Sequence, residues 1–521
     1  MRAWAQSITA ALLVVLVATL ATVTATGDGA GSDRVGAVSL AQGTQASSPE
    51  PQRPNLVFVL TDDMRDDDLD HMPITRRLLV DEGMELTDAI SPHPLCCPAR
   101  AQLATGQYAQ NNGVQHNRGV HGGFQALDPS QEASAWFRDE GYRTAFVGKF
   151  LNGYHPGDVR PAGWTRWDAL TRGVYDYQTF SMTGDGDPVR YTDSYITSVI
   201  EDRTNEDVRD FARAGDPFVV YAWHLAPHYR ITPEGGRGLP PAMPQDEGLF
   251  LDERPSSFDD PAFNEDDVTD QPSYLRNRAP VSPDEVRAEN TARLQSLQAV
   301  DRAVGSLVET LEQEGVLDDT YIVFTSDNGY SLGEHRFVGK DVLTEEALQV
   351  PLVVRGPGIA PGSTSDLPVT LVDLPATFAA LTGVTTQWQV DGTSLAPTLR
   401  GEPQSFRDTT LVQTGRTLGN GWSHRGVRTE RYLYGTDGAE GFLYDRLLDP
   451  GEMVNLIDDP AYEAVRAALE LRRRELVDCA GWTCNQQFGP LPDPAPTSTS
   501  TGTGTGTGTD ASARPGRKTS S

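Results

Sequence analysis

The sequence predicts an α/β fold with a large, mostly parallel central sheet flanked by helices and a smaller α+β subdomain near the C-terminus. Three observations lead to this prediction. Short continuous apolar runs are typical of strands buried on both faces of a sheet, helical apolar periodicity separates two of these runs, and the strand signals become shorter after about Pro375. With 521 residues and 38% hydrophobic content, the chain is long enough to bury a large core.

Four apolar runs predict the central strands, and each one leads to polar residues. The runs are 55–60, 144–147, 218–223 and 321–324. In the same order, they lead to Thr61-Asp62-Asp63, Gly148-Lys149, Pro227-His228 and Ser326-Asp327-Asn328-Gly329. Ligands of open α/β sheets bind outside the carboxyl ends of the strands. We therefore expect a polar site at this edge.

The elements after the third strand complete the predicted fold. A crossover helix packed on the sheet is indicated by apolar residues at helical spacing, namely Leu294, Leu297, Val300, Val304, Leu307, Val308 and Leu311. The acidic, proline-rich stretch 233–283 predicts surface loops, of the kind that often shape a substrate pocket. The catalytic domain would span 54–375 and the C-terminal subdomain 376–489. In the subdomain we expect strands near 410–413, 426–434 and 442–444 and a helix over 462–477.

Both ends of the chain differ in composition from its middle. The apolar run 8–23 is shorter than a membrane-spanning helix and ends in small residues, so 1–25 is predicted to be a secretory signal peptide, with an uncleaved anchor as the alternative. Residues 26–53 predict a flexible leader, and the Thr-Gly-rich stretch 490–521 predicts a disordered tail. We therefore expect a secreted or extracytoplasmic protein with no stable membrane insertion after signal cleavage.

The net charge and the cysteines limit which ligands and partners we expect for this chain. The net charge of -30 argues against nucleic acid, whose affinity for proteins comes from Lys and Arg neutralising phosphates. An anionic ligand would need a local cationic cluster. In an exported chain Cys479 and Cys484 are the natural disulfide pair, whereas zinc would lack a second ligand pair nearby.

Cys96 is a candidate nucleophile. In Cys96-Cys97-Pro98-Ala99-Arg100, the proline suits the first turn of a helix. Cys96 would then lie at a helix N-terminus, which favours a developing anion, and Arg100 would lie one turn further on the same face. The alternatives are a buried small hydrophobic residue or half of a disulfide.

The polar residues after the first and fourth strands predict a metal site. Asp62, Asp63, Asp327 and Asn328 offer only oxygen ligands, which suit Ca²⁺, with Mg²⁺ or Mn²⁺ in reserve. A site with two zinc ions is disfavoured because few of the nine histidines lie near these strand ends. Taken singly, the same residues are typical of turns. The neighbouring run 66–68 is interpreted as a solvated acidic face.

A cationic cluster at the same edge would bind a tetrahedral anion. Lys149, His228 and Lys340 would be surface or structural residues in most chains, but the first two follow strand ends and can converge with Arg100. Converging positive groups stabilise the charge of a transition state. His228 is the natural proton donor to a leaving alcohol.

These segments together resemble the type I sulfatase family. The resemblance covers about 54–460 and is similar in motif to the N-acetylglucosamine-6-sulfatase and heparan endosulfatase branch. It rests on six segments in the family's order, which are 54–63, 96–106, 148–154, 226–228, 325–330 and 350–358. The resemblance implies an alkaline-phosphatase-like fold and a sulfatase that acts on sulfated sugars or related sulfate esters.

The resemblance also implies a mechanism. Cys96 would be converted to formylglycine by a formylglycine-generating enzyme, with Cys97 at the variable position of the motif. One Ca²⁺ would be held by Asp62, Asp63, Asp327, Asn328 and residue 96. The aldehyde hydrate would form a covalent sulfate ester and then expel sulfate. Arg100 would help to activate the hydrate, Lys149 and Lys340 would hold sulfate oxygens, and His228 would protonate the departing alcohol.

One position departs from the pattern of many arylsulfatases. Many arylsulfatases carry a histidine at the position of Leu151. The sugar-sulfatase branch resembles this chain in having leucine there. We interpret Leu151 as a specificity signal. Three alternatives stay open: an arylsulfatase of broad specificity, a phosphodiesterase or phosphonate monoester hydrolase of the same superfamily, and a non-enzymatic calcium-binding surface protein.

Overall fold

The computed structural model describes residues 53–184, 188–416 and 421–496. The predicted signal peptide, nearly all of the predicted leader and most of the predicted tail lie outside these residues. Within the described ranges, no helix combines the length and apolar character needed to cross a membrane. The domain boundary at about residue 375 stays a prediction.

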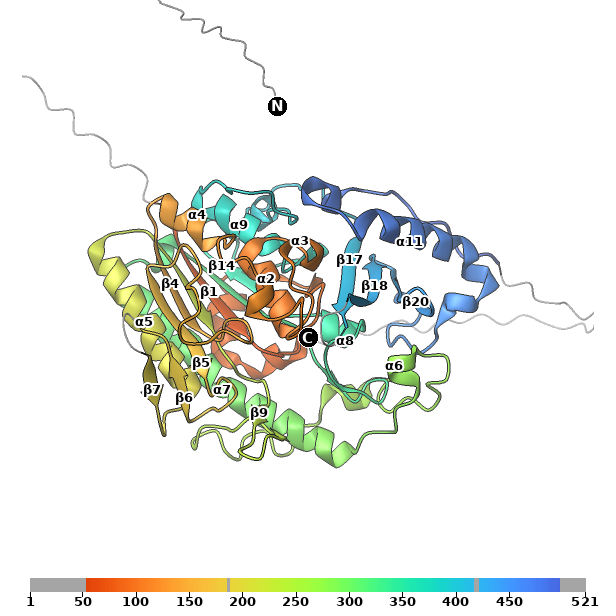
Figure 1. The fold of residues 1–521 in the computed structure, drawn as a ribbon, viewed down its shortest axis with the longest axis horizontal. Coiled ribbons are helices and arrows are strands. Elements are labelled where there is room, and N and C mark those ends of the chain that lie inside the picture. Colours follow the sequence, from red (N-terminus) through yellow and green to blue (C-terminus); the bar gives the residue numbers. More distant parts are fainter. Residues whose placement is uncertain (1–52, 185–187, 417–420, 497–521) are drawn as a thin grey trace, which may run out of the picture. The chain divides into compact units, whose positions relative to one another are not determined.

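A ten-stranded sheet forms the centre of the fold, in the order β15-β2-β14-β11-β1-β8-β4-β5-β6-β7 (Figure 1). Its middle strands are parallel: β11 (Thr320–Ser326), β1 (Asn55–Thr61), β8 (Phe218–Trp223), β4 (Arg143–Gly148) and β5 (Arg166–Arg172). The outer strands are β14 (Leu352–Arg355), β2 (Met84–Leu86), β15 (Ser363–Ser365), β6 (Phe180–Met182) and β7 (Val189–Tyr191). Of the outer pairings, only that of β15 with β2 is parallel. The predicted mostly parallel α/β sheet is confirmed.

Helices cover both faces of this sheet. Successive residues of a strand point to opposite faces, and in β1 the side chains of Leu56 and Phe58 belong to one hydrophobic core while those of Val57 and Val59 belong to the other. The first core includes residues of α2 (Cys96–Thr105), α4 (Ser134–Asp139) and α9 (Asp373–Thr382). The second includes residues of α5 (Ile196–Ala214) and α7 (Pro283–Gln313). The predicted crossover helix is α7.

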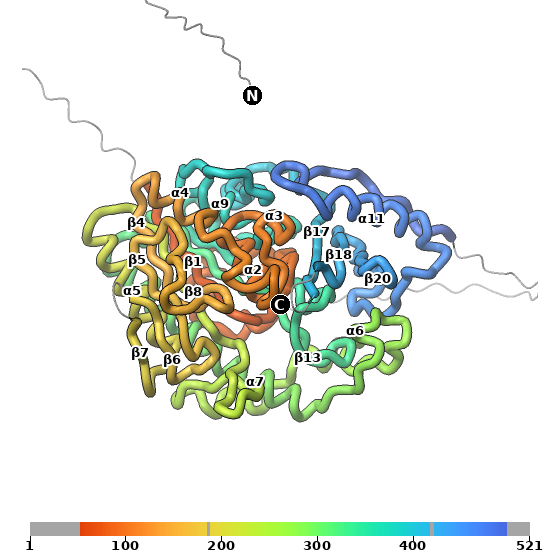
Figure 2. Tube along the Cα trace, viewed as in Figure 1, coloured from red at the N-terminus to blue at the C-terminus, as the bar shows by residue number. Residues whose placement is uncertain are grey.

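A four-stranded antiparallel sheet follows in the C-terminal part, in the order β17-β18-β19-β20 (Figure 2). Its strands are β17 (Thr410–Gly415), β18 (Trp422–Arg428), β19 (Tyr432–Thr436) and β20 (Gly441–Asp445), and α11 (Glu463–Leu476) packs on it. The single strand predicted over 426–434 is wrong, because a turn divides it: Thr429 N donates to Tyr432 O at 2.8 Å. The predicted Cys479–Cys484 disulfide is present.

Candidate active site

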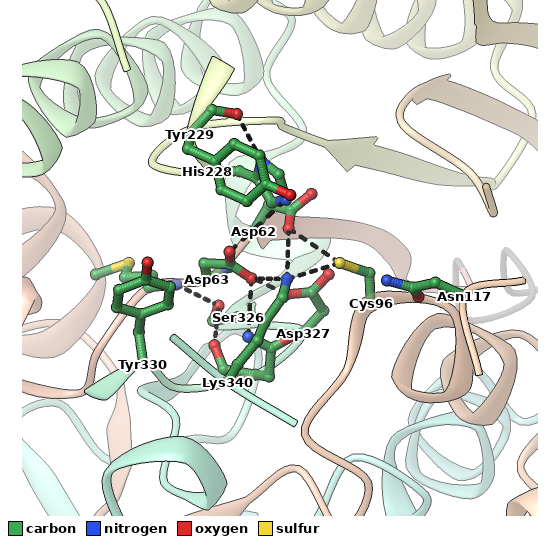
Figure 3. Close-up of polar contacts among 12 residues, drawn as sticks. Asp62, Asp63, Cys96, Asn117, His228, Tyr229, Ser326, Asp327, Tyr330 and Lys340 are labelled. Atoms are coloured by element: carbon green, nitrogen blue, oxygen red, sulfur yellow. Dashed lines mark hydrogen bonds and ion pairs between the residues drawn. The ribbon is translucent and has the colours of Figure 1, made fainter. Parts of the chain in front are cut away.

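The predicted site residues converge at the carboxyl edge of the parallel strands (Figure 3). Asp62 and Asp63 follow β1, and Asp327 and Asn328 follow β11. Because Thr61 pairs with Ser326, the two strands end side by side, and Asp63 N donates to Asp327 Oδ1 at 3.1 Å. Lys149 follows β4, His228 lies in the loop after β8, and Lys340 follows β13 (Val338–Gly339).

Close backbone packing fixes the end of β4. Gly148 has φ of +117°, and a Cβ there would lie 1.9 Å from the carbonyl oxygen of Trp223. A side chain is therefore excluded at position 148. Lys149, the next residue, donates its backbone N–H to the same carbonyl at 2.9 Å, and its side chain is buried.

The first residue of α2 is Cys96, as the proline pattern predicts. Its Sγ lies 2.7 Å from Lys340 Nζ and 3.6 Å from Asp62 Oδ1. Cys97 belongs to the hydrophobic core, and its Sγ accepts the backbone N–H of Asn152 at 3.1 Å. The two adjacent cysteines thus have different environments, and only Cys96 faces the polar cluster.

Arg100 joins the ends of three strands from one turn further along α2. Its Nε donates to Asp327 Oδ2 at 2.8 Å, its Nη2 to Asp62 Oδ2 at 3.1 Å, and its Nη1 to the carbonyl oxygen of Lys149 at 2.5 Å. Each of its three nitrogens thus donates to the end of a different strand. In this arrangement Arg100 neutralises the carboxylates rather than facing open solvent.

The two lysines neutralise the remaining carboxylate charge. Lys149 Nζ donates to Asp62, and Lys340 Nζ donates to Asp63. Burial by itself raises the pKa of Asp62, but Lys149, His228 and Arg100 outweigh it and hold this pKa below its usual value. Both carboxyl groups of the pair are therefore charged in spite of their burial.

Burial sets the protonation of Cys96 and His228. It raises the pKa of the Cys96 thiol to about 11, with a further contribution from Asp62, so an unmodified thiol is protonated at neutral pH. Burial also lowers the pKa of His228 to about 3. His228 Nδ1 donates to the carbonyl of Tyr229 at 2.7 Å, which leaves Nε2 toward Asp63 Oδ2, 3.8 Å away.

The donor set fits a divalent cation. Asp62, Asp63, Cys96 and His228 each offer one ligand atom, and these atoms lie within 4.8 Å of one another. Asp63 Oδ2 and Asn328 Oδ1 are buried and have no hydrogen-bond partner. Burial and the neighbouring Asp62 raise the pKa of Asp327, as expected of a carboxylate in need of positive charge. A cation among these oxygens would satisfy them.

A cavity of about 670 Å³ opens at the site. It is lined by residues that include His228, Lys340, Arg118, Asn152, Tyr175 and Tyr229. Among the described residues that line it, none comes from 233–283. The stretch still supports the cavity wall, because Arg237 pairs with Ile231 and its guanidinium carbon lies 4.6 Å from the ring centroid of Tyr229, and both partners line the cavity.

Several neighbours of the site could not be predicted from sequence patterns. The ring of Tyr175 lies under the Lys149 ammonium, with Nζ 4.9 Å from its centroid, and its hydroxyl donates to Asn152 Oδ1 at 2.9 Å. Asn117 Oδ1 accepts the N–H of Cys97 at 2.8 Å. These residues come from loops without strand or helix periodicity. Leu151, the position that departs from the arylsulfatase pattern, is buried in the hydrophobic core.

The interpretation of 66–68 as a solvated face is also wrong. Asp68 is buried, and its Oδ2 accepts the backbone N–H of Arg65 and pairs with Arg293 Nη2, both at 3.0 Å. Arg293 Nη2 also donates to the carbonyl oxygen of Asp63. Asp68 thus supports the loop that carries the metal-ligand candidates. The partner lies on α7, far away in sequence, so the local acidic run did not reveal it.

Known proteins match most of this chain. A family model described as "Sulfatase" matches residues 54–384, and one described as "N-sulphoglucosamine sulphohydrolase, C-terminal" matches 333–478. Human N-acetylglucosamine-6-sulfatase is 34% identical over 389 residues, which cover 70% of this chain and 67% of the relative. The extracellular sulfatase SULF-1 homolog of Drosophila melanogaster is 33% identical over 70% of this chain, but the match spans only 33% of the relative.

A solved structure confirms the fold class. It is described as being in complex with its substrate, D-glucosamine-2-N,6-O-disulfate. The likeness has a TM-score of 0.68 at 24% identity and covers 81% of this chain and 97% of the other. The alkaline-phosphatase-like fold that the sequence resemblance implied is thereby confirmed.

Proposed function

Because this chain belongs to the sulfatase family and is a sulfuric ester hydrolase, we propose that it is a secreted enzyme that removes sulfate groups from sulfated sugars. The observation that carries the proposal is the position of Cys96, at the start of α2 and 2.7 Å from Lys340 Nζ, among buried carboxylates and cations. The names of the human relative and of the ligand in the solved structure support a sulfated amino sugar as the substrate class. The extracellular relative supports secretion.

In this proposal residue 96 acts as formylglycine. As an aldehyde hydrate it would supply one hydroxyl that takes the sulfuryl group from the substrate as a covalent ester. Loss of the proton of the second hydroxyl would then re-form the aldehyde as the ester C–O bond breaks and sulfate leaves, and water would restore the hydrate. The unmodified thiol is a poor candidate because its pKa is about 11 and a protonated thiol is a weak nucleophile. The buried position of Cys96 therefore supports a modified residue.

We further propose that Asp62, Asp63, Asp327, Asn328 and residue 96 hold one Ca²⁺. When bound, this ion would supply positive charge beside the reacting group and lower the pKa of a neighbouring hydroxyl. The unpartnered Asp63 Oδ2 and Asn328 Oδ1 support the ligand set. Oxygen ligands of this kind suit a hard cation.

Two lysines hold the sulfate in the proposed mechanism. Each ammonium has three N–H donors, so Lys149 and Lys340 keep donors for sulfate oxygens while they pair with Asp62 and Asp63. Lys340 Nζ lies 2.7 Å from Cys96 Sγ, and Lys149 pairs with Asp62, whose other oxygen lies 3.6 Å from the same sulfur. Because the surroundings are dry, this positive charge acts strongly on the developing negative charge.

His228 is the proposed proton donor to the leaving alcohol. Its Nδ1–H is engaged with the carbonyl of Tyr229, so Nε2 is the atom that can carry the transferred proton. In the substrate-free site burial keeps the imidazole neutral, with a pKa of about 3. A bound sulfate ester brings a negative charge, which favours the protonated form. We therefore expect protonation of Nε2 to accompany substrate binding.

Matched substrates test the proposal. Glucosamine 6-sulfate, 4-nitrophenyl sulfate, and the corresponding phosphate and phosphonate esters would be compared by kcat/KM with the same purified protein. We expect the sugar sulfate to be turned over and both phosphoryl esters to react far more slowly. A preference for phosphoryl esters would favour the hydrolase alternative, and a preference for the aryl sulfate would favour an arylsulfatase of broad specificity.

A further inference from the structure

A second buried cluster of metal-ligand side chains shares no residue with the site around Cys96. His335, Glu346 and Glu452 each offer one ligand atom, and these atoms lie within 4.8 Å of one another. His335 lies between β12 (Ser331–Leu332) and β13, Glu346 lies in α8 (Glu345–Leu348), and Glu452 lies in the loop after β20. The cluster joins the segment that leads to Lys340 to the loop after the C-terminal sheet.

Each member of this cluster has one buried atom without a hydrogen-bond partner. These atoms are His335 Nε2, Glu346 Oε2 and Glu452 Oε1. His335 and Glu452 are each only 1% exposed, and Glu346 is half-buried. Buried polar atoms in folded proteins are nearly always hydrogen-bonded, so three unpaired ones in a single cluster indicate a missing partner.

Two other polar atoms of the cluster, on His335 and Glu452, have partners. His335 Nδ1 lies 2.8 Å from Glu265 Oε2, so this nitrogen is engaged and Nε2 is the ring nitrogen left without a partner. This is the arrangement of a histidine that binds metal through one nitrogen and donates to a carboxylate through the other. Glu452 Oε2 accepts the backbone N–H of Glu345 at 3.3 Å. Oε1 is thus the free oxygen of Glu452.

The backbone at two of the three residues is strained. His335 has φ of +50° and Glu452 has φ of +54°, in the left-handed region that residues with a Cβ rarely adopt. Such conformations persist where the surrounding structure over-determines them, and they gather at ligand sites. Here they accompany the inward placement of both side chains.

We propose that His335, Glu346 and Glu452 bind a structural zinc ion, with Glu265 as the residue that positions His335. One imidazole nitrogen and two carboxylates suit zinc, whereas hard cations such as Ca²⁺ select sets made only of oxygen. Tetrahedral zinc has ligand bonds of about 2 Å, which places its ligand atoms about 3.3 Å apart. The three ligand atoms, which lie within 4.8 Å of one another, would have to close in to that separation. The ion would then fix the segment before Lys340 against the C-terminal part of the chain.

Zinc binding by the full chain tests this proposal directly. Protein stripped of transition metals and kept in excess Ca²⁺, which occupies the oxygen site near Cys96, would be titrated with Zn²⁺ against a chromophoric chelator. Metal content after desalting would be measured by mass spectrometry. We expect about one equivalent of zinc per chain and a higher Tm in its presence. The Glu265→Gln variant should bind zinc about 10- to 100-fold more weakly, as expected on loss of a ligand's hydrogen-bonded partner.

Variants of the ligands and a matched control complete the test. His335→Gln and Glu452→Gln should lose the zinc, whereas His424→Gln should keep it, although His424 is also buried with an unpaired Nε2. A wild-type chain that binds no zinc in excess Ca²⁺ would overturn the proposal, as would a folded Glu452→Gln chain with undiminished zinc affinity. If the ligand variants do not fold, Co²⁺ in the wild-type chain decides: a tetrahedral absorption spectrum supports the site, and its absence rejects it.

Discussion

Arg100 and Asp327 form an ion pair in which Nε lies 2.8 Å from Oδ2 and both side chains are fully buried. Because Arg100 also binds Asp62, a single guanidinium from α2 holds the ends of β1 and β11 together. Two carboxylates share this cation in a dry environment. The pairing therefore both shapes the site and determines how the protein responds to loss of Arg100.

Replacement of Arg100 by Met should destabilise the protein strongly. The substitution leaves Asp62 and Asp327 with less compensating charge, and breaking a buried ion pair by removing one partner costs about 3–5 kcal/mol. Denaturant unfolding would measure the loss. The control is Arg213→Met, which removes the partner of Glu314 on the surface and should change the free energy of unfolding little. Equal effects of the two variants would contradict the account of Arg100.

Removal of Ca²⁺ should abolish turnover and lower the Tm, and Ca²⁺ should restore both. At a concentration about 100 times its Kd, the ion adds about 2.7 kcal/mol to the free energy of unfolding. Asp63→Asn should lose this response, while Asp66→Asn, in the adjacent acidic run, should keep it. Differential scanning calorimetry with and without Ca²⁺ provides the measurement, and a Ca²⁺ response that survives in Asp63→Asn would reject the ligand set.

Replacement of His228 by Gln should slow the hydrolysis of sugar sulfates more than that of aryl sulfates. A sugar alkoxide needs a proton as it leaves, so loss of the donor should cost about 10²–10⁴ in kcat, whereas a nitrophenolate leaves without one. His224→Gln is the matched control, since His224 also follows β8 and is buried, with its pKa lowered to about 3 by burial. An equal loss on both substrates in His228→Gln would argue against the role of proton donor.

Because of Glu132, the free energy of unfolding should fall as the pH rises. Burial raises its pKa from 4.5 to about 8, although Trp164 Nε1 donates to it at 2.7 Å. The folded state thus binds a proton that the unfolded state has released. The contribution of this group is complete below pH 4.5 and is lost as the pH rises toward 8, on the order of 4 kcal/mol in all.

Unfolding of the wild type and of Glu132→Gln between pH 5 and 9 checks this effect. The amide does not titrate, so the variant should gain stability relative to the wild type as the pH rises through this range. Other titrating groups are common to both chains and cancel in the difference. Parallel stability curves would show that Glu132 has no raised pKa.

The sequence predicted the parts of the site that follow buried strands. The apolar runs of β1 and β11 place Asp62 and Asp327 at one edge because parallel strands end together. Cys96 was located by a proline that suits a helix start. These features depend on residues that are close together in the sequence, so a sequence pattern can predict them.

Contacts between residues that are far apart in the chain could not be predicted from the sequence. Asp68 looked solvated because its neighbours are acidic, yet Arg293 of α7 buries it. The cavity is lined by loop residues such as Arg118 and Tyr175, and not by the acidic loops that composition favoured. His335 and Glu452 meet only because the fold brings the loop after β20 to the segment before Lys340. Such contacts depend on packing between distant segments, which no periodicity encodes.

Variants of the two adjacent cysteines should distinguish a catalytic role from a role in core packing. Cys96→Ala should abolish turnover, because the proposed nucleophile is lost while a small buried side chain is retained. Cys97→Ala should keep turnover and lose only stability, about 1–3 kcal/mol, since Cys97 belongs to the core and its Sγ accepts the N–H of Asn152. Rates and unfolding free energies of both variants check this contrast, and an active Cys96→Ala enzyme would contradict it.

The most direct test of the central claim is peptide mass spectrometry across residues 96–100 of active protein from its native host. The account predicts the mass of formylglycine, or of its hydrate, at position 96 and an unmodified cysteine at position 97. In the Cys96→Ala variant the modified species should be absent. An unmodified Cys96 thiol in fully active protein would contradict the proposed mechanism.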